Sequence, residues 1–469
     1  MKRYKALAFD FDGTLFDTHR VNFEAYQSAY RDLGIEITQE QFERTHGKSV
    51  YEFNEILGVD CDVEKLRQLK SEYYKKSVLE ARPNEYLIYV MRNCHLPVAI
   101  VTTARLRNIM PLLYKYELAD LVDVLVTQED VHGRFKPDSY AYQLAFEQLG
   151  VEAKDVMVFE DEQVGIIAAR NAGADVIKIS KFHVNCIADI SGGSDAYTRL
   201  FWGFRDCCPK VRKSACGDAR LKLEEQCEFL RKQDYPFVKV LSYSEFENVY
   251  DYSMEFIPGM ELYRHPNRTQ LFARAMEIVA GVTRIGNYAD SRYKEIRKDC
   301  YETYIAPGMK IYEEVTGDKK TIPFFSWEDI PELVCYFDYA PCHGDTTLEN
   351  IMVSSDGQMY LIDPVPKNVV SGRVHDFSKL LQSLYGYEKI RDEGECSAEE
   401  YAAEKEIFNN NARKFLSETE YNSLKFFTAC LFFRRLKYQV RQNKDLVKVY
   451  GDIAFRLMDE FAKKDYVIK

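Results

Sequence analysis

The N-terminal part of the chain alternates short apolar runs with longer amphipathic stretches. The apolar runs occupy residues 5–9, 96–101, 122–126 and 155–159. Runs of this length that stop at polar residues predict buried strands. Stretches with helical spacing, 138–149 and 165–172, follow the third and fourth runs. This alternation is typical of an α/β fold with a doubly wound parallel sheet.

Polar residues stand at the ends of these predicted strands. The first strand is followed by Asp10 and Asp12, the second by Thr102 and the fourth by Asp161. Lys136 lies in the loop beyond the third strand. The carboxyl ends of parallel strands meet in one crevice, so we expect these side chains to converge.

Two carboxylates two residues apart can face one pocket, because the period of a strand is two. Cleavage of a phosphomonoester needs a nucleophile, a cation that offsets its charge and an acid for the leaving alkoxide. We expect Asp10 to attack phosphorus and become an aspartyl phosphate. Asp12 would protonate the leaving group and then activate water, while Gly13 lets the chain turn tightly beside the phosphate.

The other strand-end residues complete this predicted site. Thr102 and Lys136 would hold the phosphoryl oxygens. Asp161, with Glu160 in support, would bind Mg²⁺, a hard ion that prefers carboxylate oxygen. The full set of predicted magnesium ligands is Asp10, Asp12, Glu160 and Asp161.

These motifs together resemble the haloacid dehalogenase superfamily of phosphatases, over residues 1–181. The motifs are DFDGTLFDT, VTTA, the lysine of FKPDSYAYQLA, and EDEQVGIIAARNAGA. The resemblance is closest to the beta-phosphoglucomutase and phosphoglycolate phosphatase branch, and it implies a helical cap over residues 20 to about 84. That segment has a helical pattern, with a face formed by Ala25, Tyr26, Ala29 and Leu33.

The chain departs from this branch at two positions. Glu162 stands where the family usually has serine, and Asn22 lies near the place of a histidine in the mutases, which favours simple hydrolysis. The cap segment Thr45–Ser49 matches the loop that reads the substrate. Its Lys48 would meet a second anionic group, or is a solvated lysine. Thr103 and Arg105 are further candidate substrate contacts.

A second set of motifs begins after residue 185. A strand, two glycines (Gly192 and Gly193) and a second strand predict a hairpin whose backbone closes over phosphates. A third strand, 210–215, would present Lys213 to the phosphates of ATP. The following helix, 219–231, carries Glu224 and Glu225, of which we expect Glu225 to pair with that lysine.

The segment 252–259, which contains Glu255, has the pattern of a hinge strand that contacts adenine. Downstream, Asp345 in His-Gly-Asp would accept the proton of an attacking hydroxyl. Asn350 and Asp363 would bind Mg²⁺, and positioning with charge neutralisation is most of what phosphoryl transfer requires.

We expect two flanking residues of this second site to be structural. His343 would pack the loop, and Asp376 would be a buried brace for it. Only twelve residues separate Asp363 from Asp376, which argues against an activation segment and a peptide acceptor.

This half resembles the aminoglycoside phosphotransferase and choline kinase-like family, with Thr347 where the family often has a second histidine. The resemblance implies a two-lobed, protein-kinase-like α+β domain over residues 185–469, with lobes at about 185–256 and 257–469. It also implies ATP, Mg²⁺ and a small hydroxyl acceptor. Aromatic-rich helical tracts at about 263–317 and 397–464 would build the acceptor pocket, from a few of residues such as Tyr301, Tyr304, Tyr312 and Trp327.

Composition narrows the class of protein. The formal charge of −11 argues against a nucleic-acid binder, and no apolar run is long enough to predict a transmembrane helix. The first apolar run stops at Asp10, as a strand does and a signal peptide does not. The 12 cysteines are scattered, without a CxxC pair, which favours reduced thiols in a cytoplasmic protein.

Three functions fit the pair of motifs. The first moves a phosphate on one small molecule: a kinase phosphorylates a hydroxyl of a sugar, polyol or amino alcohol, and a phosphatase removes a different phosphate, in preparation for nucleotide-sugar or surface-polysaccharide synthesis. The second is a salvage or repair pair with unrelated substrates. The third is a regulatory or antibiotic-modifying kinase with a sensor domain. The sequence leaves both substrates and the oligomeric state open.

Overall fold

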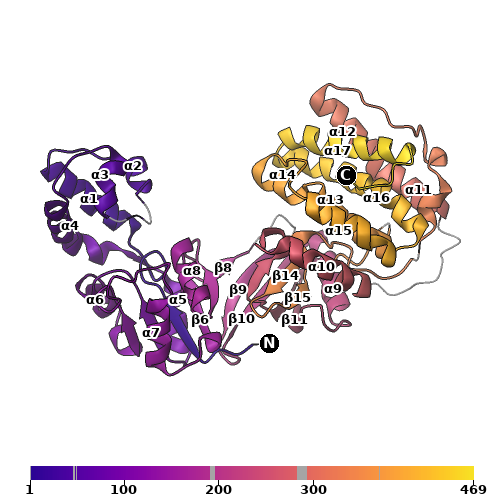
Figure 1. The fold of residues 1–469 in the computed structure, drawn as a ribbon. Helices are drawn as coiled ribbons and strands as arrows, with labels where there is room; N and C mark the ends of the chain where they lie inside the picture. The colour runs from indigo at the N-terminus through magenta and orange to yellow at the C-terminus, as the bar shows by residue number, and fades with distance from the viewer. Residues whose placement is uncertain are drawn as a thin grey trace. The chain divides into compact units, whose positions relative to one another are not determined.

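The computed structural model divides into two compact units. It describes residues 2–45, 48, 50–190, 196–282, 293–337, 339–368 and 370–468. Unit 1 contains Met1–Arg220 and Leu241–Pro258, and unit 2 contains Leu221–Val240 and Gly259–Lys469 (Figure 1). The predicted domain junction at residues 181–185 therefore lies inside unit 1.

A five-stranded parallel sheet forms the centre of unit 1, in the order β5-β4-β1-β6-β7. The four predicted strands are confirmed as β1 (Ala6–Phe9), β4 (Val98–Val101), β5 (Val124–Val126) and β6 (Val156–Glu160). The sequence analysis missed the edge strand β7 (Asp175–Lys178). The structure thus confirms an α/β fold with a parallel sheet.

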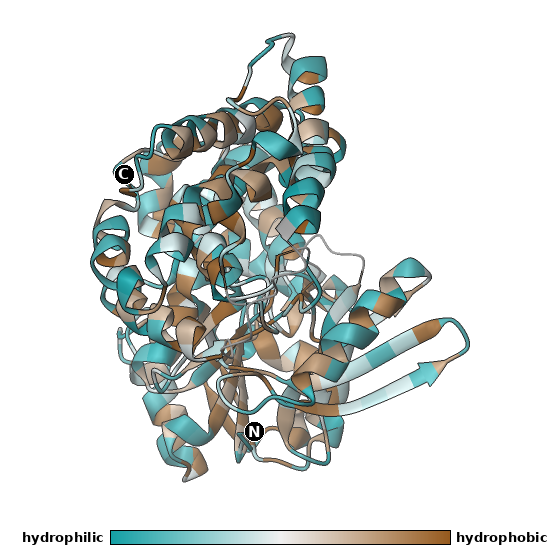
Figure 2. Ribbon diagram, turned by 90° about the vertical axis from the view of Figure 1, so that its right-hand side faces the viewer, coloured by the Kyte–Doolittle hydropathy of each residue, from teal (hydrophilic) through white to brown (hydrophobic). Residues whose placement is uncertain are grey.

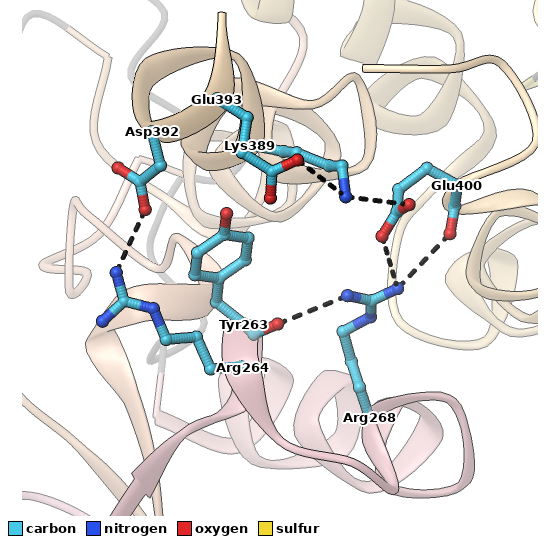
Figure 3. A pocket seen from close by; sticks show the side chains of 7 residues that line it. All are labelled: Tyr263, Arg264, Arg268, Lys389, Asp392, Glu393 and Glu400. Carbon is cyan, nitrogen blue, oxygen red and sulfur yellow. Dashed lines mark hydrogen bonds and ion pairs between the residues drawn. The ribbon is translucent and has the colours of Figure 1, made fainter. Parts of the chain in front are cut away.

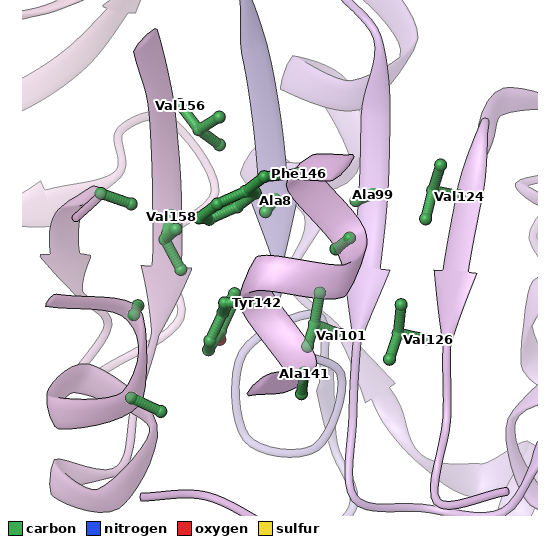
Figure 4. Close-up of a cluster of buried hydrophobic side chains, with 14 of the residues drawn as sticks. Ala8, Ala99, Val101, Val124, Val126, Ala141, Tyr142, Phe146, Val156 and Val158 are labelled. Atoms are coloured by element: carbon green, nitrogen blue, oxygen red, sulfur yellow. The ribbon is translucent and has the colours of Figure 1, made fainter. Parts of the chain in front are cut away.

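One face of this sheet is covered by α7 (Tyr140–Leu149) and α8 (Gln163–Asn171). Small strand residues, Ala8 and Val158 among them, face the buried rings of Tyr142 and Phe146 (Figure 4). Alternate residues of a strand point to opposite faces, so short residues leave room for helices here, and the large residues lie on the other face.

The second face of the sheet carries the stacked rings of Phe9 and Phe159, whose centroids are 4.8 Å apart. Trp202, from a strand outside the parallel sheet, lies edge-on against Phe159 at 6.3 Å. Its backbone N–H donates a hydrogen bond to the hydroxyl of Tyr86 in α5 (Glu85–Asn93). The tryptophan is 3% exposed, so the packing between these segments excludes water.

Trp202 belongs to a second, antiparallel sheet in unit 1, with strand order β11-β12-β10-β9-β8. Its strands are β8 (Ala188–Asp189), β9 (Tyr197–Gly203), β10 (Cys208–Cys216), β11 (Val240–Phe246) and β12 (Val249–Glu255). The hairpin strands and the strand around Lys213 are where the sequence predicts them. The backbone N–H of Tyr4 donates to the carbonyl of Cys207 and adds a second connection to the segment before β1.

The predicted cap segment is helical and begins and ends at a short two-stranded ribbon, β2 (Phe16–Asp17) paired with β3 (Arg82–Pro83). Its helices, which lie beside one another in Figure 1, are α1 (His19–Asp32), α2 (Gln39–Glu43), α3 (Phe53–Leu57) and α4 (Val63–Ser77). Buried residues such as Tyr30, Phe42 and Leu66 give this segment its own apolar core. A further helix, α6 (Leu106–Lys115), follows β4.

Unit 2 is mainly helical and has a small antiparallel sheet of β13 (Gly259–Glu261), β14 (Ile351–Ser354) and β15 (Met359–Leu361). Its helices are α10 (Arg268–Val282), α11 (Tyr293–Asp299), α12 (Ala306–Thr316), α13 (Arg373–Leu384), α14 (Tyr387–Glu393), α15 (Ala402–Asn411), α16 (Glu418–Gln442) and α17 (Asp445–Ala462). The helix α9 (Asp218–Leu230) begins in unit 1 and continues in unit 2.

Most helices carry hydrophilic residues on one side and hydrophobic residues on the other, as expected for helices that cover a core (Figure 2). Over the residues that the structure describes, no helix combines the length and the apolar character needed to cross a membrane. None of the twelve cysteines, all of which lie in the described part of the chain, forms a disulfide.

Candidate functional site

The parallel sheet brings together most of the predicted phosphoryl-transfer residues of unit 1. The ammonium of Lys136 lies 2.7 Å from Asp10 Oδ1 and 2.5 Å from Glu160 Oε1, and it also donates to the carbonyl of Val101 at 3.1 Å. Asp10 directly follows β1 and Glu160 ends the adjacent strand β6, so parallel pairing places both at one edge. The loop after β5 supplies the lysine.

Three carboxylates at this edge, those of Asp10, Glu160 and Asp161, have oxygen atoms within 4.8 Å of one another. Burial, with the charges of Glu160 and Glu162, raises the pKa of Asp161 to about 7. Burial alone would lower the pKa of Lys136, but the neighbouring carboxylates outweigh it and the pKa lies well above its ordinary value. The site therefore holds more carboxylates than cations, which is an arrangement suited to a bound metal ion.

Asp12 is separate from this carboxylate cluster. Its Oδ1 accepts a hydrogen bond of 2.5 Å from the hydroxyl of Thr18. Burial raises the pKa of Asp12, and the hydrogen bond from Thr18 opposes the rise. A carboxyl group that keeps its proton more readily fits the predicted acid role, and Asp12 as a magnesium ligand stays a prediction.

Gly13 allows the first loop to pass directly beside Asp161. Its φ is +80°, and a Cβ built on it would lie 2.0 Å from Asp161 Oδ2. Thr14, the next residue, donates to Asp161 Oδ1 at 3.3 Å. No residue with a side chain fits at position 13 without moving the predicted metal ligand.

Thr102 ends β4, is buried, and has a hydroxyl that accepts the N–H of Ala104 at 3.0 Å. It also hydrogen-bonds Asp12 and so opposes the rise in its pKa. Of the predicted substrate contacts, Thr103 is exposed, Arg105 donates to Gln128 at 3.4 Å, and Lys48 is exposed. No bound substrate tests these three, and they stay predictions.

The sequence analysis missed Lys70, which lies on the cap helix α4. Its ammonium lies 4.3 Å from the ring centroid of Tyr74 and 5.1 Å from that of Tyr26. Burial lowers the pKa of Lys70 to about 8, and the charge of Asp12 opposes this. The cap thus places a cation within electrostatic reach of the predicted acid. Only the i, i+4 spacing to Tyr74 hints at this position in the sequence.

Tyr142 was also missed as a site residue. Its hydroxyl donates to Glu160 Oε1 at 2.9 Å, so this one oxygen accepts from both the lysine and the tyrosine. Glu160 therefore orients Lys136 as well as joining the carboxylate cluster. In the sequence Tyr142 reads as an ordinary residue of the apolar face of a helix.

The second predicted site has its catalytic loop in unit 2. Asp376 is fully buried, and its two carboxylate oxygens accept the backbone N–H groups of His343 (3.1 Å) and Gly344 (2.7 Å). The His343 ring bonds the carbonyl of Ile362 at 2.8 Å and stacks on Phe237, with the centroids 5.9 Å apart. Both residues are structural, as the sequence analysis predicts.

This brace holds Asp345 at the end of the loop. Asp345 Oδ1 lies 3.0 Å from the ammonium of Lys379 on α13, and its carbonyl accepts the side-chain amide of Asn350 at 2.8 Å. Burial alone would raise the pKa of Asp345, but the Lys379 ammonium outweighs it and the pKa lies below its ordinary value.

Asp363 follows β15 with a φ of +55°, a left-handed conformation uncommon for aspartate. Ile362, just before it, donates its N–H to the carbonyl of Asn350 at 3.0 Å, so the two predicted metal ligands share one hairpin.

The predicted ATP-binding residues are distributed over both units. Lys213 is buried on β10, opposite Tyr252 of β12, and Glu255 ends β12. Glu225 Oε1 lies 2.5 Å from the ammonium of Lys367 within unit 2. The pairing of Lys213 with Glu225 stays a prediction. The remaining two predictions, Gly192 and Gly193, lie outside the described residues.

Unit 2 also contains a pocket of about 380 Å³ with a charged lining. Its lining residues are Tyr263, Arg264, Arg268, Lys389, Asp392, Glu393 and Glu400. Three cations and three carboxylates pair with one another across it (Figure 3). The pairs offset each other, and no predicted site residue belongs to the lining.

Comparison with known proteins identifies the first region. The family model described as haloacid dehalogenase-like hydrolase matches residues 7–179. The phosphorylated carbohydrates phosphatase of Thermotoga maritima is 30% identical over 182 residues, which are 37% of this chain and 83% of that protein. The validoxylamine A 7'-phosphate phosphatase of Streptomyces hygroscopicus is 27% identical and covers 38% of this chain and 87% of itself. The fructose-1-phosphate phosphatase YqaB of Escherichia coli is 27% identical, with 38% and 97% covered.

The family match covers the strands that carry Asp10, Thr102 and Glu160, and the relative that is 30% identical is covered over most of its length. The chain belongs to the haloacid dehalogenase-like hydrolase family and is a phosphatase.

Proposed function

We propose that unit 1 hydrolyses the phosphate ester of a small phosphorylated compound at Asp10. The observation that carries this proposal is the contact of Lys136 with both Asp10 and Glu160, 2.7 and 2.5 Å, at the carboxyl edge of the sheet. A lysine in this position offsets the charge of both the nucleophile and an incoming phosphoryl group.

In the first proposed step, a carboxylate oxygen of Asp10 forms a bond to phosphorus while the bond from phosphorus to the ester oxygen breaks. Asp12 gives its proton to the leaving alkoxide. In the second step, Asp12 takes a proton from water, whose oxygen attacks phosphorus and releases Asp10 and inorganic phosphate. Lys136 and Thr102 hold the phosphoryl oxygens in both steps.

The residues present fit a magnesium ion. Asp10 and Asp161 offer hard carboxylate oxygens, and Gly13 keeps the space beside Asp161 free of a side chain. When bound, Mg²⁺ neutralises charge on the phosphoryl group. Glu160 is the less available ligand, because its Oε1 already accepts two hydrogen bonds.

Sugar phosphates are the substrate class that we propose for this site. The relatives described above are named for phosphorylated carbohydrates, validoxylamine A 7'-phosphate and fructose 1-phosphate. The cationic Lys70 and the tyrosines beside it are cap groups that suit a polar, anionic compound.

We propose a second activity, ATP-dependent phosphorylation of a small hydroxyl compound, for the loop that contains Asp345. The specific observation is that Asp376 fixes this loop through two backbone N–H groups, while Asn350 and Asp363 are linked through one hairpin. A base, two oxygen ligands and a lysine can supply the positioning and charge neutralisation that phosphoryl transfer requires. ATP and Mg²⁺ are the proposed co-substrate and ion.

A reciprocal pair of variants tests the two assignments. Asp10→Asn should abolish hydrolysis of an aryl phosphate and leave ATP-dependent phosphorylation intact. Asp345→Ala should lower phosphorylation by about two to four orders of magnitude, as expected for a lost general base, and leave hydrolysis intact. Hydrolysis that persists in Asp10→Asn contradicts the first assignment. ATP consumption that survives Asp345→Ala but disappears in Asp10→Asn means that the two sites have been exchanged.

Joined in one chain, the two activities would relocate a phosphate. A monophosphate treated with ATP and the intact protein should give an isomeric monophosphate plus one inorganic phosphate per ATP used. With Asp10→Asn the bisphosphate should accumulate instead, since the route that removes the original phosphate is closed. Phosphorus NMR resolves these products. If the kinase site accepts only unphosphorylated compounds, the two activities are better explained as a salvage pair with unrelated substrates.

A further inference from the structure

Two adjacent arginines of α16, Arg434 and Arg435, are half-buried among aromatic rings. Over the described ranges, neither forms an ion pair or hydrogen bond with a carboxylate, and the Arg435 Nε is buried without a hydrogen-bond partner. Aromatic rings hold them instead. The Arg434 guanidinium lies 5.6 Å from the ring centroid of Tyr304, and that of Arg435 lies 5.4 Å from Tyr387 and 5.6 Å from Tyr438.

Other arginines of unit 2 are paired. Arg268 bonds Glu404 at 2.9 Å, and Arg391 bonds Glu349 at 2.6 Å. Partial burial of a cation costs free energy unless an anion compensates for it. Two neighbouring cations that the described residues do not compensate in this way are suited to an anionic ligand.

Several contacts place this pair at the loop of Asp345. The hydroxyl of Thr428 on α16 donates to the carbonyl of Ser378 on α13 at 3.3 Å, and the next residue, Lys379, is the one that contacts Asp345. Arg435 follows Thr428 by seven residues, about two helical turns, so it lies on the same face of α16. The charge of the adjacent Arg434 helps to hold down the pKa values of both Asp345 and the buried His375.

A second set of contacts, through α14, links Arg435 to the same loop. Arg435 lies over the ring of Tyr387, which is the first residue of α14. In that helix Arg391 reaches Glu349, one residue before Asn350. Lys379 forms an ion pair with Asp345, whereas neither arginine forms one with a carboxylate of the described residues. The acceptor side of the loop is thus cationic, which disfavours a positively charged amino alcohol.

We propose that Arg434 and Arg435 bind a phosphate group already present on the acceptor, so that the Asp345 site phosphorylates a hydroxyl of a small monophosphate. This inference rests on the phosphotransferase function proposed above. A planar guanidinium can donate two parallel hydrogen bonds to two oxygens of one phosphate, which the ammonium of a lysine cannot do. In the reaction, the acceptor hydroxyl oxygen bonds the γ-phosphorus, the bond to the ADP oxygen breaks, and the hydroxyl proton passes to Asp345.

The test uses the full-length Asp10→Asn protein, in which the phosphatase site cannot remove the acceptor's phosphate. Matched pairs of acceptors are offered with ATP and Mg²⁺: glycerol and glycerol 3-phosphate, glucose and glucose 6-phosphate, fructose and fructose 1-phosphate. At least one monophosphate should exceed its parent compound by about 100-fold in kcat/KM, as expected for two or more charge-assisted contacts.

In the same background, Arg434→Gln and Arg435→Gln should each raise the KM for the accepted monophosphate by about 10- to 100-fold and leave the KM for ATP within about twofold. Arg441→Gln, the matched loss of an exposed arginine from the same helix, should change neither. Arg434→Lys keeps the charge but loses the bidentate guanidinium, so it should give an intermediate KM. This variant provides the test if a glutamine variant does not fold.

Three results overturn the inference in distinguishable ways. Parent compounds phosphorylated as well as their monophosphates would remove the need for an anionic acceptor and leave the phosphotransferase function standing. Arginine variants that lower kcat for every acceptor without raising an acceptor KM would place the guanidinium groups at the transferred phosphoryl group. The absence of ATP-dependent phosphorylation with every compound would refute the proposed function itself.

Discussion

The buried carboxyl of Glu388 should make the stability of unit 2 depend on pH. Glu388 lies in α14 with no exposed surface, and its Oε1 accepts the N–H of Leu348 at 2.9 Å and the hydroxyl of Ser383 at 2.6 Å. Its Oε2 has no hydrogen-bond partner. Burial, with the charge of Glu349, raises the pKa of Glu388 to about 7, against the opposing charge of Arg391.

The phenols around Glu388 do not titrate in this range, whereas burial also raises the pKa of the neighbouring Glu349. The phenols of Tyr263, Tyr401 and Tyr450 face Glu388, and burial raises the pKa of each above the ordinary value, so they stay neutral near pH 7. Comparison of Glu388→Gln with wild type isolates the titration of Glu388, because Glu349 is present in both proteins.

The direction and size of the effect follow from proton linkage. The ordinary pKa of 4.5 applies to the unfolded chain, and the folded chain binds the proton more tightly. The contribution to stability is thus full below about pH 4.5 and is lost as pH rises to about 7. Glu388→Gln keeps the shape and cannot ionise. Its free energy of unfolding relative to wild type should increase by roughly 2 to 3 kcal/mol between pH 5 and pH 8.

Urea denaturation followed by tryptophan fluorescence measures this difference. The chain has two tryptophans, and a Trp202→Phe background leaves Trp327 of unit 2 as the reporter. Glu393→Gln, an exposed glutamate of the same helix, is the matched control and should show a change below about 0.5 kcal/mol. An equal stability difference at both pH values for Glu388→Gln would refute the reasoning.

Three further changes test unit 1. Gly13→Ala should lower phosphatase activity by about 100-fold or more, because the new Cβ would lie 2.0 Å from Asp161 Oδ2, and a variant as active as wild type would contradict the geometry. Trp202→Ala should lower the free energy of unfolding of unit 1 by about 3 to 5 kcal/mol in chemical denaturation; a loss below about 1 kcal/mol would show that its packing is not important. Lys70→Met should raise the KM for sugar phosphates by about tenfold, measured by phosphate release, whereas the exposed control Lys75→Met should not.

The strands that carry the phosphatase site were predictable because each is a continuous apolar run. A run such as 155–159 is buried on both faces of a parallel sheet, so its residues have no polar alternation and stand out in the sequence. The edge strand β7 begins with Asp175 and ends with Lys178, and four residues with charged ends give no such signal. The motif residues Asp10 and Lys136 were predictable for a different reason, since their chemistry fixes their spacing to the strands.

The residues that were missed depend on tertiary packing. Lys70 and Glu388 look like ordinary surface charges of amphipathic helices, and only the fold buries one beside Asp12 and the other beneath Leu348. Arg434 and Arg435 likewise follow an apolar stretch without any motif. Trp202 gave no sign in the sequence that it covers a sheet which begins nearly 200 residues earlier, and for this reason the junction expected at 181–185 falls inside unit 1.

The division of the chain also has a consequence for synthesis on the ribosome. The polypeptide passes between the units three times, after Arg220, Val240 and Pro258. Unit 1 lacks β11 and β12 until residue 258 has emerged, although residues 221–240, which belong to unit 2, emerge earlier. Unit 1 as a whole therefore cannot be complete before residue 258 has been synthesised. Residues 221–240 are synthesised first and can pack into unit 2 only after the residues from Gly259 onward have emerged.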